Sequence, residues 1–332
     1  MASTATVCVI IAAKDAARTI GRAVASALRD DHVVEVVVVD DGSADRTAEA
    51  ALGADDASGR LRILRLDINQ GPSYARNHAI AHSNAPLIAI LDADDFFLAG
   101  RFDRLLGEDD WDFVADNVVF VEAGDAEPPE PEVPDFEAEP CFLDAASFIA
   151  GNISRRGASR GEIGFLKPVM RRAFLDIKGL RYDESLRLGE DYDLYARALI
   201  KGARYKVVHG CGYGAVVRAD SLSGRHATAD LKNLCEADRA MLTLPTVNGA
   251  ARAALRRHER HICARYELRR FLDVKSKKGL VAAGLHALSH PFALPAIVGG
   301  VGADKLDGLK ERMRPAERPL PRYLLGARAV QK

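Results

Sequence analysis

The sequence predicts an α/β protein with a mostly parallel sheet, helices on both faces of the sheet, and a helical, basic C-terminal extension. Three observations favour this fold. Short β-branched runs alternate with amphipathic segments through the N-terminal third. Acidic turns follow several of these runs, and Lys and Arg are concentrated near the C-terminus. With 332 residues, 48% of them hydrophobic, the chain can form one large domain and a sizeable extension.

The N-terminal strands are expected at four apolar runs. Each has the length and the β-branched content of a buried strand. These runs are Val7–Ala12, Val34–Val39, Leu61–Leu66 and Pro86–Leu91. Because the segments between them have helical character, the sheet should be mostly parallel, with its ligand site at the carboxyl ends of the strands.

Amphipathic helices are expected between these strands. The first opens after Asp15, and the second follows Ser43, which is a suitable N-cap. The third begins near Pro72, in the first-turn position where a missing N–H does no harm.

The middle of the chain changes character. Residues 124–140 are rich in Pro and Glu and predict an acidic extended loop that links two lobes. A short helix near Leu143–Ala150 and a Gly/Arg-rich loop from Gly151 to Gly164 should follow, and a long basic helical region should run from about Ala227 to Lys278.

Carboxylates follow three of the predicted strands. Asp92-Ala93-Asp94-Asp95 places three acids in four residues, which would repel one another strongly without a cation. This pattern predicts a hard divalent ion, Mg²⁺ or Mn²⁺; the alternative is an acidic solvated turn. Asp40-Asp41-Gly42-Ser43 could contact a ribose or a base, or form only a strand-to-helix turn. No G-x-G-x-x-G follows the first strand, so a nicotinamide cofactor is not expected.

Five motifs in order resemble family-2 glycosyltransferases of the GT-A fold over roughly residues 6–225. They are Val7–Asp15 with Ile20–Val24, Val38–Ser43, Gly71-Pro72 leading to Ala75-Arg76-Asn77, Leu91–Asp95, and Gly189-Glu190-Asp191-Tyr192-Asp193-Leu194. Within this family the chain has the look of bacterial exopolysaccharide glucosyltransferases of the succinoglycan type.

The resemblance implies a UDP-sugar donor, with glucose as the first expectation, and a glycan or lipid-linked oligosaccharide acceptor. Asp191, with Glu190, would be catalytic, and a carboxylate on the acceptor side is what a single inverting displacement needs. The metal would be held by Asp94, Asp92 and Asp95. The donor would contact Ala12, Ala13, Lys14, Asp15, Asp40, Asp41, Arg76, Asp92, Ala93 and Asp94. Glu190 and Asp191 could also simply charge a helix N-terminus.

The same resemblance divides the chain into four parts. They are a nucleotide-sugar-binding half (1–123), the acidic Pro-rich linker (124–141), an acceptor-binding and catalytic half (142–226) and the basic helical extension (227–332).

The chain departs from the family pattern after its first strand. Lys14 stands where the family usually has an aromatic residue, so base recognition is less well defined, and a solvent-facing lysine is the default. Asp15 replaces the usual Asn and is expected to cap the first helix. A loose polar cluster (Arg218, Ser221, Ser223, Arg225 and His226) could close over a diphosphate, and Arg155, Arg156 and Arg160 suggest an acceptor-side loop.

The C-terminal extension is strongly basic. Residues 250–332 carry 18 Lys or Arg and 7 Asp or Glu, whereas residues 1–249 carry 28 and 40. A basic tail favours an anionic membrane surface, and no nucleic acid is expected because the tail lacks aromatics spaced for base stacking. The uncharged stretch Gly279–Ala303 contains two prolines and predicts a monotopic hairpin, or else a helical pair on the catalytic domain.

The predicted location is cytoplasmic, peripheral on the inner face of the bacterial plasma membrane. Five cysteines without a C-x-x-C favour reduced thiols, and no secretion signal precedes Lys14-Asp15.

Two other classes of protein agree less well with the sequence. A sugar-phosphate nucleotidyltransferase should open with a glycine-rich basic loop, which Ala12–Asp15 does not supply. A catalytically silent nucleotide- or glycan-binding scaffold is disfavoured by the acids Asp92, Asp94, Asp95 and Asp191.

Overall fold

The computed structural model describes residues 6–123, 130–131, 133, 141–154, 162–217, 227–290, 294–295, 299 and 322–325. The chain divides into two compact units. The first contains residues up to 221 together with the C-terminal segment from residue 321, and the second contains residues 222–320.

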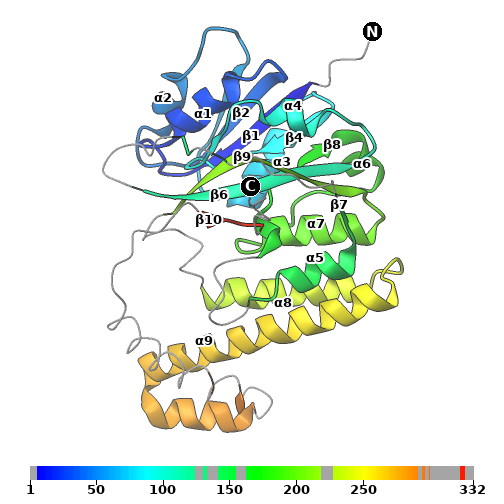
Figure 1. Cartoon of the computed structure of the whole chain (residues 1–332). Coiled ribbons are helices and arrows are strands. Elements are labelled where there is room, and N and C mark those ends of the chain that lie inside the picture. Colours follow the sequence, from blue (N-terminus) through cyan, green and yellow to red (C-terminus); the bar gives the residue numbers. More distant parts are fainter. Residues whose placement is uncertain are drawn as a thin grey trace. The chain divides into compact units, whose positions relative to one another are not determined.

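The N-terminal half of the first unit's sheet is parallel, as predicted. The strands β1 (Val7–Ala13), β2 (Val33–Asp41), β3 (Leu61–Leu66) and β4 (Leu87–Ile90) run in the order β3-β2-β1-β4. Ile10, Ile11 and Val38 have no exposed surface, which explains their uninterrupted apolar sequence. Figure 1 shows these strands in blue and cyan with helices beside them.

Three helices connect these strands. They are α1 (Ile20–Leu28), α2 (Thr47–Leu52) and α3 (Pro72–Ala81), and Pro72 occupies the first turn of α3 as predicted. Both predicted caps are wrong. Thr19 precedes α1 and Arg46 precedes α2, while the Ser43 hydroxyl accepts from the Asp15 N–H at 2.9 Å. Asp15 and Ser43 therefore join the loops after β1 and β2 to each other instead of starting helices.

The other half of the sheet is mixed. Beyond β4 the order continues β8-β6-β9-β5, with β8 antiparallel to both neighbours, β6 parallel to β9, and β5 antiparallel to β9. The bounds are β5 (Phe96–Phe97), β6 (Phe113–Glu122), β8 (Val169–Arg171) and β9 (Tyr205–Val217), with β7 (Cys141–Leu143) pairing with β9. The helices of this half are α4 (Arg101–Leu105), α5 (Ala145–Gly151), α6 (Arg172–Ile177) and α7 (Glu190–Ile200), with a 3₁₀ turn at Ile163–Phe165.

The end of the chain returns to this sheet. Strand β10 (Arg322–Tyr323) pairs antiparallel with β6, and the side-chain oxygen of Asn117 accepts from the Leu325 N–H at 2.8 Å. From sequence this segment is expected in the basic extension (227–332), but in the structure it belongs to the first unit.

The second unit contains two long helices, α8 (Thr228–Leu242) and α9 (Gly249–Ser289). The expected long helical region is therefore interrupted between the two helices. Gly279 has φ +82° and breaks α9, and beyond it Ala287 packs against Phe271 and Leu294. The last part of α9 thus folds back on the part before Gly279.

Cys235 of α8 and Cys263 of α9 form a disulfide. The expectation of five free thiols is wrong at this pair, because packing of the two helices brings cysteines far apart in sequence side by side.

Within the described ranges, none of the helices has the length and apolar character needed to cross a bilayer. The expected acidic linker lies mostly outside the described residues, but Glu130 is described and forms an ion pair with Arg29 at 2.7 Å.

Candidate active site

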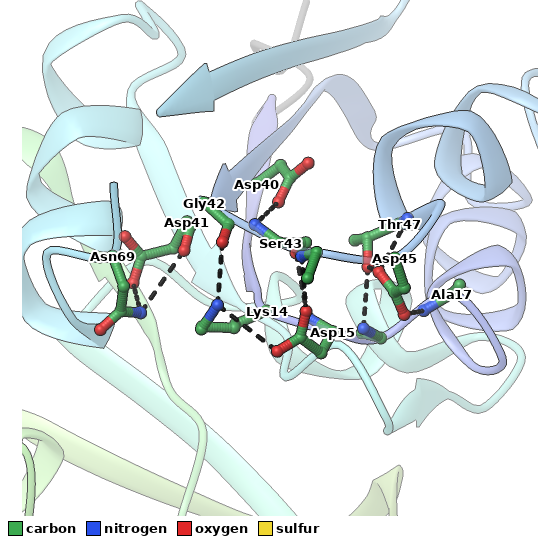
Figure 2. A network of polar contacts seen from close by, with 12 residues as sticks. Lys14, Asp15, Ala17, Asp40, Asp41, Gly42, Ser43, Asp45, Thr47 and Asn69 are labelled. Carbon is green, nitrogen blue, oxygen red and sulfur yellow. Dashed lines mark hydrogen bonds and ion pairs between the residues drawn. The ribbon is translucent and has the colours of Figure 1, made fainter. Parts of the chain in front are cut away.

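The acidic strand ends predicted to converge lie at the same edge of the sheet. Strand β1 pairs with β2 on one side and β4 on the other, all in parallel, so the segments that follow them are neighbours. Figure 2 shows the network after β1 and β2, where the Lys14 ammonium donates to the Gly42 carbonyl at 2.9 Å and lies 3.4 Å from the Asp15 carboxylate.

The Asp15 carboxylate completes the link between these two loops. It accepts from the Ala44 N–H at 2.8 Å. The Lys14 side chain is 40% exposed, so it combines a solvent-facing position with a fixed contact to the opposite loop.

Asp41 shapes the loop that leads into α3. Its carboxylate accepts from the Asn69 side-chain amide at 2.7 Å and from the N–H groups of Gln70 and Gly71 at 2.7 and 2.8 Å. Gly42, with φ +66°, allows the close approach, because a Cβ there would lie 2.8 Å from the Asn69 nitrogen. The D-D-G-S motif therefore has a structural role, and the predicted contact of Asp41 with a nucleotide stays a prediction.

Asp40 is fully buried at the end of β2. Its Oδ1 accepts from the Ser43 N–H at 3.0 Å, and its Oδ2 lies 3.4 Å from the Arg65 guanidinium. Asp40 thus holds the same turn from the other side.

The three carboxylates after β4 have different surroundings. Asp92 and Asp94 are half-buried, whereas Asp95 is buried and accepts from the Tyr213 hydroxyl at 2.8 Å and the Val216 N–H at 2.8 Å. Burial, with the nearby charges of Asp94 and Asp92, raises the pKa of Asp95 well above its usual range. Asp95 therefore attaches this turn to β9.

Asp95 already uses both carboxylate oxygens in these contacts, whereas Asp92 and Asp94 are half-buried. The assignment of a metal ion to Asp92, Asp94 and Asp95 stays a prediction.

Two buried cations lie among the acids of the site. Arg76 of α3 donates to Asp92 at 2.9 Å and to Glu190 at 2.8 Å, and its guanidinium carbon lies 5.3 Å from the centre of the Tyr182 ring. Lys167 precedes β8, and its ammonium lies 2.8 Å from Asp92 and 2.7 Å from Asp191. The turn after β4 and the start of α7 are therefore joined through side chains of two other segments.

Lys167 and Asp92 stay ionised in the site because each lies next to groups of opposite charge. Burial alone would lower the pKa of Lys167, but the carboxylates of Asp191 and Asp92 outweigh it and raise that pKa. Burial alone would raise the pKa of Asp92, but Lys167 and Arg76 hold it well below its usual range. The site thus contains fixed, paired charges of both signs.

Asp191 and Glu190 begin helix α7. Gly189, with φ +73°, precedes them in a left-handed conformation that suits glycine. The Asp191 Oδ2 accepts from Lys167, whereas Oδ1 is buried without a hydrogen-bond partner in the described structure and lies 3.4 Å from the Arg76 guanidinium. The two oxygens of the Asp191 carboxylate therefore have different surroundings.

Lys167 is the site residue that the sequence analysis missed. The backbone carbonyl of Lys167 accepts from Arg101 at 2.6 Å, and Arg101 forms a fully buried ion pair with Asp116 at 3.0 Å. In the sequence Lys167 is a single basic residue before a short apolar run, which gives no signal of a site residue. The buried ion pair between Arg101 and Asp116 can be recognised only from the fold. The Arg155–Arg160 loop and the cluster from Arg218 to His226 lie outside the described residues.

Comparison with known protein families assigns this chain to the glycosyltransferases. The model of glycosyl transferase family 2 matches residues 8–177, and the chain belongs to this family. It is a glycosyltransferase of GT-A-like fold with a helical C-terminal region.

Two relatives from Rhizobium meliloti (strain 1021) cover most of the chain. The succinoglycan biosynthesis protein ExoU is 57% identical over 98% of this chain and 97% of its own length. The succinoglycan biosynthesis protein ExoO is 35% identical over 86% of this chain and 82% of its own. Among solved structures, S. aureus TarS 1-349 in complex with UDP-GlcNAc matches with a TM-score of 0.60 and 19% identity, covering 88% of this chain and 79% of that one.

Proposed function

We propose that this chain is an inverting hexosyltransferase that moves a sugar, with glucose as first choice, from a UDP-sugar to a growing lipid-linked exopolysaccharide. The observation that carries the proposal is Asp191, whose buried Oδ1 has no hydrogen-bond partner in the described structure, while Oδ2 is held by Lys167. The names of the two Rhizobium relatives support an exopolysaccharide product, and the UDP-GlcNAc complex of TarS supports a UDP-sugar donor.

The reaction needs one base on the acceptor side. The acceptor hydroxyl oxygen forms a bond to the anomeric carbon, and its proton passes to Asp191 Oδ1. The bond between the anomeric carbon and the diphosphate oxygen breaks, and UDP departs with the electron pair. A single displacement of this kind inverts the anomeric centre.

We also propose that a divalent cation binds at the turn after β4. Asp92 and Asp94 are half-buried carboxylates of the same turn, and carboxylate oxygens are the ligands that Mg²⁺ and Mn²⁺ prefer. Asp92 and Asp94 would hold the ion. When bound, the ion would supply positive charge next to the departing diphosphate.

The test is a calorimetric titration of the protein with UDP, and in parallel with ADP, GDP and NAD⁺, each with and without Mn²⁺. We expect UDP alone to bind tightly, in a metal-dependent manner, and a panel of UDP-sugars then identifies the donor. If no nucleotide binds, the chain is a silent scaffold and the proposal is wrong. A preference for another base would point to Lys14 and the loop after β1.

We also propose that the second unit makes peripheral contact with the inner face of the plasma membrane. After the break at Gly279, four large apolar side chains are 65–80% exposed: Leu280, Val281, Leu285 and Leu288. At helical spacing they lie on one face, while Ala283 and Ala287 are buried. We call these four residues the apolar ridge. The exposed Lys275, Lys277 and Lys278 precede it and complement an anionic headgroup layer.

A further inference from the structure

Lys167 is held in place from two sides. Its backbone carbonyl accepts from Arg101 at 2.6 Å, and Arg101 is itself paired with Asp116, neither having any exposed surface. Its side chain is 6% exposed and ends between Asp92 and Asp191. Because a buried lysine loses side-chain freedom and hydration, this arrangement is stable only when the ammonium keeps its carboxylate partners.

The contact of Lys167 with Asp191 distinguishes the two oxygens of that carboxylate. Oδ2 accepts from the ammonium at 2.7 Å, and Oδ1 is left, without a hydrogen bond in the described structure, 3.4 Å from Arg76. Without Lys167 the carboxylate could rotate about its terminal torsion, which is broad and roughly two-fold. Arg76 alone does not select one oxygen, since it is also bonded to Glu190 and Asp92.

We propose that Lys167 is the positioning residue of the base: its ammonium holds the Asp191 carboxylate through Oδ2, and it ties the base to the donor-side turn at Asp92. This inference rests on the proposed glycosyl transfer. Lys167 would then connect the turn after β4 and the start of α7 in one network of ion pairs.

The experiment compares Lys167→Met, Lys167→Arg and a matched control, Lys206→Met, in the full chain. Lys206 of β9 suits this purpose because it is also buried, at 4% exposure, and also bridges two carboxylates, those of Asp110 and Glu108. Neither acid belongs to the site. Release of UDP is measured with UDP-glucose, UDP-galactose and UDP-N-acetylglucosamine, with water as acceptor, and UDP affinity and thermal midpoint are measured for every variant.

We expect Lys167→Met to lower kcat by at least ~100-fold, since a small misplacement of a reacting group has an effect of this size. Donor KM and UDP affinity should change less than about threefold. Lys167→Arg should recover part of kcat, and Lys206→Met should keep the wild-type kcat even if its thermal midpoint falls.

The other outcomes are separable. If Lys167→Met loses UDP affinity with kcat unchanged, Lys167 is a donor-binding residue and the inference is wrong. If Lys167→Met and Lys206→Met are equally impaired in kcat, the effect is general destabilisation and the inference is wrong. If the wild type neither binds UDP nor releases it from any of the three sugars, the proposed function fails, and the role of Lys167 fails with it.

Discussion

At the residue scale, acids that look alike in the sequence have different roles in the structure. Asp41 and Asp95 are buried and accept hydrogen bonds from backbone N–H groups of other segments. Asp191 instead keeps one buried oxygen without a hydrogen bond in the described structure. Asp40 and Asp116 also have one such oxygen, so it is the position of Asp191 beside Lys167 and Arg76 that makes it the candidate base.

Asp191→Asn tests the base. The amide cannot take the acceptor proton, so turnover of the donor should fall by about 10²–10⁴-fold. UDP affinity should stay within about threefold of the wild type, since Asp191 is expected on the acceptor side. Steady-state UDP release and calorimetry measure the two effects. A large loss of UDP affinity would show that this carboxylate serves the nucleotide.

A second pair of substitutions separates the acids after β4. Asp94→Asn should weaken UDP binding in Mn²⁺ by at least about tenfold and leave metal-free binding unchanged. Asp95→Asn should instead lower the free energy of unfolding by about 1–3 kcal/mol, because it disturbs the contacts with Tyr213 and Val216. Calorimetry and denaturant unfolding of both variants are the measurements. Equal losses of metal-dependent binding would return Asp95 to the ligand set.

At the scale of elements, the loops after β1 and β2 are locked together, and α8 is joined to α9. Lys14, Asp15 and Ser43 connect the first pair of loops through three hydrogen bonds. A buried contact between the Asp238 carboxylate and the His258 ring, at 2.7 Å, joins the two helices near the Cys235–Cys263 disulfide. Asp15 and Ser43, which are expected to be helix caps, therefore join two loops instead. Cys235 and Cys263, which are expected to be free thiols, join two helices.

The cysteines give a prediction at this scale. Burial raises the pKa of Cys8 and Cys211 to about 12, so almost no thiolate is present at pH 8, while Cys141 is exposed. In the native protein without reductant, a chromogenic disulfide reagent at pH 8 should react quickly with one thiol per chain, and Cys141→Ser should abolish this phase.

Denaturation completes the thiol titration. Three thiols should react after unfolding without reductant, and all five after reduction, because Cys235 and Cys263 are paired. Five thiols before reduction would show that this pair is open in solution.

At the scale of the whole molecule, the charge of the chain is unevenly distributed, and its C-terminal end is not a simple appendage. Most of the basic residues of the C-terminal region and the apolar ridge belong to the second unit, whereas β10 belongs to the sheet of the first. Truncation at Lys278 would remove β10 along with the ridge, so point substitutions in the full chain are the cleaner test of membrane contact.

Val281→Asp should weaken binding to vesicles of phosphatidylglycerol and phosphatidylcholine by about tenfold, because it places a negative charge on the ridge. Ile177→Asp is the matched control: both side chains are 80% exposed, but Ile177 lies at the end of α6 in the first unit. Cosedimentation is the measurement. Equal binding of wild type and Val281→Asp would contradict membrane contact through the ridge, and self-association that Val281→Asp abolishes would assign the ridge to a second copy of the chain.

Much of the first unit could be predicted from sequence because its signals are local. The parallel strands β1–β4, the start of α3 at Pro72 and the convergence of acids at the strand ends follow from β-branched runs, proline chemistry and the geometry of parallel sheets. The motif at Gly189–Leu194 likewise placed Asp191 at a helix start. Each of these features depends on residues within a short stretch of chain.

Only the tertiary structure decided which polar groups meet. Lys167 lies 24 residues from Asp191 in sequence, Arg101 lies 66 residues from Lys167, and Asn117 lies 208 residues from Leu325. Pairings over such distances depend on strand order and helix packing, which no local pattern encodes. The sequence by itself therefore determined the class of protein and its acidic groups, while the buried cations that orient those groups, and the return of the chain end to the sheet, were decided by the fold.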